Sequence, residues 1–226
     1  MQRRIKKTEN ASALGTMLTF ADAFVELCEE TPLKKVSISD IIERTGKNRK
    51  TFYYHFENKD YLIIWIFRHD LSTALKARFS ESSLIYEEPS PAATSRLPFY
   101  IRQKSGIRSL NHAEFFDCFA SVLESRRSFY YQALMETGPG SLHSHLFDLY
   151  SQAFKSDIDL VLSNRYLPKR EIDFLAEFYA SAFLSYFIRK CGQANQPLLG
   201  TAGGFANIIH GSLEHAINSA QLRRNL

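Results

Sequence analysis

The segment 37–62, SISDIIERTGKNRKTFYYHFENKDYL, constrains the fold of this chain more than any other. Its apolar residues recur at helical spacing on both sides of Gly46, which predicts two short helices joined by a tight turn. The second of these helices, expected over 49–55, is both basic and aromatic. A helix of this kind on a helical support is how many proteins enter the major groove of DNA, so the segment predicts a helix-turn-helix DNA-binding unit.

The ends of the predicted helices are marked by residues that cap helices. Ser37 followed by Asp40 has the character of a capping box, in which a hydroxyl and a carboxylate satisfy backbone amides at a helix start. Asn48 and Asn58 stand where they can cap the next two helices. A longer helix over about 8–30, with apolar residues three and four apart, precedes them and supplies the support.

The helix expected over 49–55 divides into a packing face and a contact face. Phe52 and Phe56 are four residues apart, so they share the face that packs on the preceding helices. Arg49 or Lys50 can donate hydrogen bonds to a guanine edge. The residues predicted to contact DNA are Ser37, Lys47, Asn48, Arg49, Lys50, Thr51, Tyr53, Tyr54, His55 and Lys59.

Within this set, Tyr53, His55 and Lys59 are expected to bond phosphate oxygens rather than bases. The alternative is a charged turn between two core helices, whose tyrosines are half-buried for packing. The glycine turn, the two caps and the interleaved Phe and Tyr residues together favour DNA binding over that alternative.

Residues 45–62, TGKNRKTFYYHFENKDYL, resemble the signature of the TetR family of transcriptional regulators. In that family a glycine turn leads into a Thr-Leu/Phe-Tyr-Tyr-His-Phe helix, and a lysine lies near the start of the next helix. The first helix and the segment 37–42 match the family pattern too, so the resemblance covers about residues 8–66. Lys47 departs from the pattern, because the family usually places a small apolar residue there, packed in the turn.

The resemblance implies a homodimer that binds double-stranded DNA at a roughly palindromic operator. It also implies a ligand domain whose small-molecule effector changes the spacing of the two recognition helices, as in a repressor released by its effector. Activators and ligand-independent members of the family exist, so the sign of regulation stays open. The expected domains are a DNA-binding domain over 1–57 and a ligand-binding and dimerisation domain over 58–226. A helical protein-interaction module that has lost DNA binding is the alternative.

The rest of the chain has helical periodicity and no strand-like alternation, which predicts an all-α protein. Residues 80–98 are rich in Ser, Glu and Pro and are expected to form a linker or loop. Further helices are predicted over about 109–126, 128–137, 141–164, 168–191 and 202–222. The expected fold is an N-terminal three-helix helix-turn-helix domain followed by a larger C-terminal helical domain.

The C-terminal part offers two sets of apolar residues with two interpretations each. One set can line a ligand pocket or simply fill the core: Phe115, Phe116, Phe119, Tyr150, Phe154 and Tyr179. The other can form a dimer interface or belong to the core of a single chain: Phe178, Ala182, Phe183, Tyr186, Phe205, Ile209 and Leu213.

Other classes of function find little support in the sequence. The net charge of +4 is modest, so the chain is not a general polycation. No phosphate-binding glycine loop or nucleophile motif is present, which argues against an enzyme. The cysteines, 28, 118 and 191, are widely spaced, so neither a disulfide framework nor a metal site is expected, and no cofactor is. No apolar stretch is long enough to predict a membrane span, which favours a cytoplasmic location.

Overall fold

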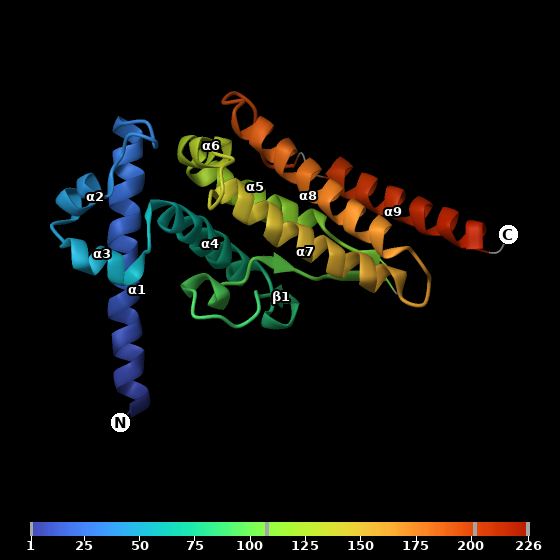
Figure 1. Cartoon of the computed structure of the whole chain (residues 1–226), viewed down its shortest axis with the longest axis horizontal. Coiled ribbons are helices and arrows are strands. Elements are labelled where there is room, and N and C mark those ends of the chain that lie inside the picture. The colour runs from blue at the N-terminus through green and yellow to red at the C-terminus, as the bar shows by residue number, and fades with distance from the viewer. Residues whose placement is uncertain (1, 107–108, 201–202, 225–226) are drawn as a thin grey trace.

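In the computed structural model, which describes residues 2–106, 109–200 and 203–224, a small unit of short helices sits at one end of an elongated helical body (Figure 1). The small unit stands around the long first helix, and the fourth helix runs from it into the body. The described helices are α1 Gln2–Glu30, α2 Ile38–Thr45, α3 Arg49–His55, α4 Lys59–Arg78, α5 Ala113–Ser125, α6 Arg127–Met135, α7 Leu142–Leu162, α8 Lys169–Cys191 and α9 Gly203–Arg224.

Local capping explains why the short helices begin where the sequence predicts. The Ser37 hydroxyl accepts from the Asp40 amide at 3.3 Å, and the Asp40 carboxylate accepts from the Ser37 amide at 2.7 Å. This capping box satisfies amides that the first turn of α2 leaves free. At its other end α2 stops at Gly46, whose φ of 62° lies in the left-handed region that favours glycine.

The small unit is held by an aromatic core. Phe20 of α1, Phe52 of α3 and the following Phe56 are wholly buried, and the rings of Phe20 and Phe52 meet edge to face at 5.3 Å. Ile41 of α2 is buried in the same core. Because Phe52 and Phe56 are committed to this face, as the sequence predicts, the other residues of α3 are turned outward.

The segment between α4 and α5 contains short strands, and the sequence expectation of a plain linker followed by a helix from 109 was wrong there. Strand β1 (Leu84–Ile85) pairs antiparallel with β2 (Tyr100–Ile101), and β3 (Lys104–Gly106) pairs with β4 (Ser109–Leu110). Two 3-10 turns, 81–83 and 93–96, accompany them. Strands of two or three residues are too short to show an alternating pattern in the sequence.

The helical body is built around stacked aromatic rings. Phe119 of α5, Tyr150 of α7 and Phe183 of α8 are wholly buried, and the Phe119 and Phe183 ring centroids are 4.8 Å apart. Helices α7 and α8 lie side by side, while α9 lies against α8 at the end of the molecule away from α3 (Figure 1). The three cysteines are free and buried. Within the described ranges, no helix combines the length and apolarity that crossing a membrane requires.

Helix α6 joins the small unit to the body. Phe129 of α6 packs edge to face on Phe24 of α1 at 5.7 Å. Arg126, at the start of α6, lies 3.3 Å from the Asp22 carboxylate on α1 and 3.6 Å from the Asp70 carboxylate on α4. Tyr130 donates a 2.5 Å hydrogen bond to the same Asp70. The orientation of the helix-turn-helix unit is therefore fixed by side chains of both α4 and α6.

Candidate nucleic-acid interface

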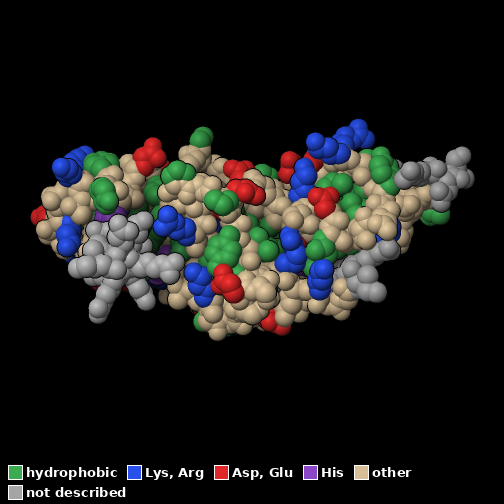
Figure 2. Space-filling view, turned by 90° about the horizontal axis from the view of Figure 1, so that it is seen from below, with side chains coloured by type: hydrophobic (Ala, Val, Ile, Leu, Met, Phe, Trp, Pro, Cys, Tyr) green, Lys and Arg blue, Asp and Glu red, His purple; other side chains and the backbone are tan. Residues whose placement is uncertain are grey.

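Helix α3 presents its cations and tyrosines to solvent. Tyr54 is 83% exposed, Tyr53 is 45% exposed, and Arg49 and Lys50 are exposed beside them. Seen from below, Lys and Arg side chains lie at this end of the molecule, next to residues drawn in grey (Figure 2). An exposed aromatic side chain next to a cation on a short helix is suited to contact the phosphates of DNA and the base edges in its major groove.

Arg49 and Tyr53 form a pair one helical turn apart. The guanidinium carbon lies 5.6 Å from the Tyr53 ring centroid, and Nη2 donates to the phenol oxygen at 3.4 Å. Such a contact limits the rotamers of both side chains before any partner binds, which lowers the entropy lost on binding.

The N-terminus of α3 is capped by residues that the sequence predicts at the interface. The Asn48 side-chain oxygen accepts from the Thr51 amide at 2.8 Å and from the Thr51 hydroxyl at 3.0 Å. Ser37 is likewise used in the capping box of α2. These side chains fix the helix ends, which leaves backbone amides of the two N-termini as the groups that can face an anion.

Lys59 is placed differently from the sequence expectation of a phosphate contact. Its ammonium group donates to the carbonyl oxygens of Leu33 at 3.1 Å, Lys34 at 3.4 Å and Val36 at 2.9 Å. An ammonium group has three donors, and all three have acceptors in the α1–α2 loop. The geometry therefore favours a structural role for Lys59. The local sequence could not reveal it, because the acceptors lie more than twenty positions away.

Lys47 and His55 flank the exposed face of α3. Lys47 is exposed and does not pack in the turn, which fits its departure from the pattern of small apolar residues. His55 is half-buried, with its ring edge to face on Tyr54 at 4.9 Å. Burial lowers the pKa of His55 below its ordinary value, so its ring is neutral at neutral pH and can donate from one nitrogen only.

The residues predicted to line a ligand pocket form the core of the body instead. All six are buried, and Phe154 and Tyr179 line a small void of about 20 Å³. The rings fill the space between α5, α7 and α8 because each edge meets a neighbouring face.

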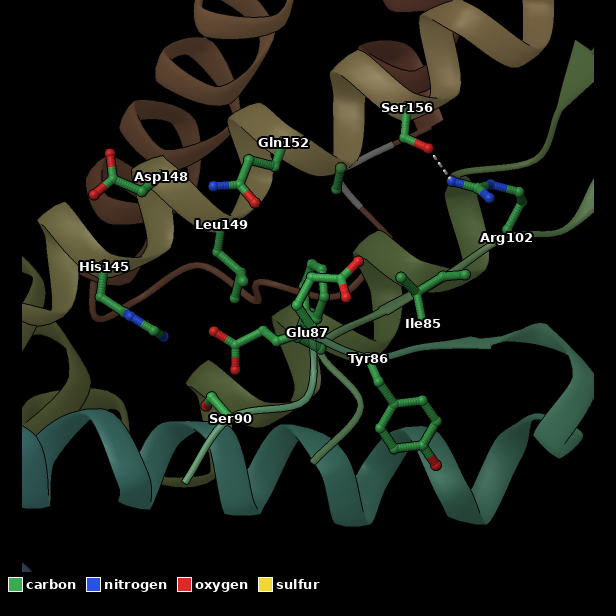
Figure 3. A pocket seen from close by; sticks show the side chains of 13 residues that line it. Ile85, Tyr86, Glu87, Ser90, Arg102, His145, Asp148, Leu149, Gln152 and Ser156 are labelled. Carbon is green, nitrogen blue, oxygen red and sulfur yellow. Dashed lines mark hydrogen bonds between the residues drawn. The ribbon is translucent and has the colours of Figure 1, made fainter. Parts of the chain in front are cut away.

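A cavity of about 440 Å³ lies elsewhere, between α7 and the segment that carries β1 and β2 (Figure 3). Its lining residues are Ile85, Tyr86, Glu87, Glu88, Ser90, Phe99, Arg102, His145, Asp148, Leu149, Gln152, Ala153 and Ser156. Sequence reasoning missed them because half come from a segment without helical periodicity, whose position depends on pairing across the chain. No group of three or more metal-ligating side chains forms a site among the described residues.

The predicted dimer residues divide by exposure. Phe183, Ile209 and Leu213 are buried within the single chain, whereas Phe178 is 52% exposed. Ala182 and Tyr186 are half-buried, and the side chain of Phe205 lies outside the described residues. Phe174, one helical turn before Phe178, is 64% exposed and stacks on Phe178 with ring centroids 6.1 Å apart.

The fold and the exposed helix define a helix-turn-helix DNA-binding protein. Two family models match the chain: one for bacterial regulatory proteins of the tetR family over residues 21–64, and one for a transcriptional regulator C-terminal region over residues 111–189. The chain belongs to the TetR family of transcriptional regulators, as the resemblance of its helix-turn-helix segment predicts. This membership supports DNA-binding regulation and agrees with the expectation that the chain is not an enzyme.

Among known proteins, the chain is similar to the HTH-type dhaKLM operon transcriptional activator DhaS of Lactococcus lactis subsp. lactis (strain IL1403), at 35% identity over 57 residues. That match spans 25% of this chain and 30% of the relative, so it covers less than a third of each. A solved structure of a dihydroxyacetone kinase operon activator DhaS aligns over 90% of this chain and 96% of its own, with a TM-score of 0.50 and 16% identity. TylP, a TetR regulator from Streptomyces fradiae, aligns over 91% and 87%, with a TM-score of 0.48 and 14% identity.

Proposed function

We propose that this chain is a homodimeric, cytoplasmic repressor that binds a palindromic operator through α3 and is released from it by a small-molecule effector. The geometry of α3 is the observation that best supports a contact with DNA. Phe52 is buried in the small unit, which leaves Arg49, Lys50, Tyr53 and Tyr54 facing outward on a capped helix.

We assign DNA binding and ligand binding to two separate domains, following the order of the helices along the chain. Residues 1–57 form the DNA-binding domain in this proposal, and residues 58–226 form the ligand-binding and dimerisation domain. The exposed stack of Phe174 and Phe178 on α8, together with the exposed Ile208 of α9, supplies an apolar face for a second copy. In such a dimer two α3 helices would meet major grooves about 34 Å apart, one turn of duplex DNA.

Specific observations support alternatives to an effector-released repressor. The similarity to an operon activator makes activation the alternative sign of regulation. A regulator without an effector, or a helical module that binds only protein, is the further alternative, because the aromatic centre of the body is filled.

The first test is duplex binding measured by fluorescence anisotropy. DNA flanking the protein's own gene is compared with a scrambled duplex at several salt concentrations. We expect tight binding to the flanking DNA alone, weakening as salt rises, because released counterions drive phosphate contacts. Equal and weak binding to both duplexes would contradict a sequence-specific regulator of this locus.

Variants on α3 assign the contacts. Arg49→Ala and Lys50→Ala should change the sequence preference, by about 1–3 kcal/mol where a base contact is lost. Tyr53→Ala should weaken binding to all duplexes alike. Arg170→Ala is the matched control, because Arg170 is exposed at the start of α8, far from α3 (Figure 1). Uniform weakening by every α3 variant would overturn the assignment of base contacts.

The sign of regulation is tested with a reporter gene behind the bound promoter. Deleting this protein should raise expression if it represses, and adding it back should lower expression. A fall in expression on deletion would establish activation instead.

A further inference from the structure

The cavity between α7 and the β1–β2 segment has both charged and apolar walls. Figure 3 shows the side chains of Glu87, Leu149 and Gln152 around the same space. Its volume of about 440 Å³ lies within the range of pockets that bind small organic molecules. Ile85 and Phe99 add apolar surface to the wall.

Acidic side chains outnumber basic ones in the wall of this cavity. Glu87, Glu88 and Asp148 line it with three carboxylates. The guanidinium of Arg102 is already engaged, since it donates to the Ser156 hydroxyl at 2.7 Å and to a buried carboxylate, Asp157, at 3.3 Å. The walls therefore offer hydrogen-bond acceptors and negative charge to whatever enters.

Behind the cavity wall lies a buried cation on α4. Arg68 is 0% exposed, and its Nη1 donates to the Glu87 carboxylate at 2.6 Å. Its Nη2 donates to the carbonyl oxygens of Thr94 at 3.2 Å and Leu97 at 2.7 Å. The guanidinium also lies over the Phe99 ring, 5.4 Å from its centroid. Glu87 and Phe99, which both line the cavity, thus touch Arg68 directly.

Within the part of the chain that the structure describes, one nitrogen of the buried Arg68 guanidinium lacks a hydrogen-bond partner. The Nε atom is buried without a hydrogen-bond acceptor among the described residues. His145 lies 3.4 Å from Nη1 through its Nε2, and because the guanidinium can only donate, this ring is a neutral acceptor. Burial, and then the charge of Arg68, lower the pKa of His145 to about 4, so it carries no charge near neutral pH. Within the described contacts, Glu87 is the carboxylate that neutralises Arg68.

We propose that this cavity binds a small organic amine, and that the ammonium group of the ligand competes with Arg68 for the Glu87 carboxylate. An amine with an apolar body satisfies both kinds of wall: its cation meets Glu87, Glu88 or Asp148, and its carbon skeleton lies on Phe99 and Ile85. A carboxylate ligand would meet the like charges of Glu88 and Asp148. Arg102, the cation in the wall, already donates to Ser156 and Asp157, so an amine is favoured over a carboxylate.

Binding of the amine has a consequence for α4. A buried guanidinium that shares the carboxylate of Glu87 with a second cation is less stable in its present position. Three residues, 56–58, separate α3 from α4, so a shift of Arg68 moves the support of the recognition helix. The amine site itself stands on the cavity, whereas this link to DNA rests on the function proposed above.

The binding test uses three amines and their matched carboxylates. The amines are 2-phenylethylamine, n-hexylamine and 1,6-diaminohexane; the carboxylates are phenylacetate, hexanoate and adipate. Titration calorimetry and thermal melting of the full chain should show saturable binding and a raised melting temperature with at least one amine. Binding of no amine, or equal binding of an amine and its matched carboxylate, would overturn the proposal.

Two variants and a control test whether the amine binds in this cavity. Asp148→Asn and Glu87→Gln should each weaken amine binding about tenfold, the size of a lost hydrogen bond to a charged group. Asp159→Asn is the matched control, because Asp159 is an exposed carboxylate on the same helix as Asp148 but does not line the cavity. Should Glu87→Gln fail to fold, Asp148→Asn decides alone, since its side chain is exposed. Unchanged affinity in Asp148→Asn would refute the site.

Operator binding separates this inference from the proposed function. If the wild-type chain binds its operator and an amine that binds the cavity changes that affinity, both stand. If the amine binds but the chain shows no specific duplex affinity, the site stands and the proposed function fails. If operator binding is intact and no amine binds, the amine site fails alone.

Discussion

Two lysines near the recognition helix carry the same charge and face different partners. Lys50 is exposed on α3, whereas the ammonium of Lys59 is surrounded by three carbonyl oxygens of the α1–α2 loop. Carbonyl acceptors bind an ammonium through its fixed charge, and they anchor the start of α4 to the end of α1. A lysine in a basic helix-turn-helix segment is therefore not by its charge alone a DNA contact.

This difference predicts opposite effects of one substitution. Lys59→Met should lower the free energy of unfolding by about 1–2 kcal/mol, because three hydrogen bonds to a charged group are lost at a half-buried site. It should leave the salt dependence of duplex binding nearly unchanged. Lys50→Met should do the reverse, reducing the slope of log affinity against log salt by about 1 with little effect on unfolding. Denaturant titration and anisotropy measure the two quantities, and a reduced salt slope in Lys59→Met would contradict the structural role.

At the level of elements, the turn between α2 and α3 depends on a single backbone conformation. Gly46 has a φ of 62°, and an added Cβ would meet no atom within 4 Å. The cost of a side chain there is conformational rather than steric. Gly46→Ala should therefore lower the free energy of unfolding by about 1 kcal/mol, and Gly46→Asn should lower it less, because Asn visits this region more readily. Equal losses in thermal or denaturant unfolding would argue that the turn adopts another conformation.

A second feature of this kind is the cluster of charged and polar side chains around Asp70, where α4 meets α6. Burial alone would raise the pKa of Asp70, but hydrogen bonds from His69 and Tyr130 and the charge of Arg126 together hold it below its ordinary value. A depressed carboxylate pKa contributes stability above the pKa of the unfolded chain, about 3.9, and this contribution is lost as pH falls through the folded value.

The corresponding prediction concerns Asp70→Asn. At pH 7 it should lower the free energy of unfolding by about 1–2 kcal/mol, and the difference from wild type should shrink as the pH falls below about 4. Denaturant unfolding across this range measures it, with Asp159→Asn, an exposed carboxylate away from the junction, as control. A difference that stays constant with pH would show that the Asp70 charge does not stabilise the junction.

Local and non-local interactions explain which elements the sequence could predict. The ends of α2 and α3 follow from Ser37, Gly46 and Asn48, whose partners are within a few residues. The cavity could not be predicted, because Glu87 reaches it only through the pairing of β1 with β2 and through Arg68, nineteen positions earlier. The aromatic residues of the body were recognisable as buried. Whether they enclose a space or fill it depends on how three helices pack, which residue spacing does not specify.

At the scale of the whole molecule, the exposed apolar face lies at the opposite end from the recognition helix. Phe174 and Phe178 of α8 are stacked and open to solvent, and α9 lies beside them, while α3 stands at the far end (Figure 1). A second copy packed on this face would leave both α3 helices free for one duplex. Buried residues of α8 and α9, such as Phe183 and Ile209, would support that face from within the chain.

Phe178→Glu tests this arrangement, because a charge in the centre of an apolar interface is costly whereas at a solvent-exposed site it is tolerated. We expect the variant to be a folded monomer by sedimentation velocity and circular dichroism. Met135→Glu, at a site that is 54% exposed on α6, is the control and should leave the oligomeric state unchanged. Two linked binding sites typically gain about 10²–10⁴ in affinity over one, so the variant should lose its preference for a palindromic duplex over a duplex with a single half-site. Its affinity for the half-site should stay near that of the wild type, since α3 is untouched. A variant that remains dimeric, or keeps the palindrome preference as a monomer, would place the interface elsewhere.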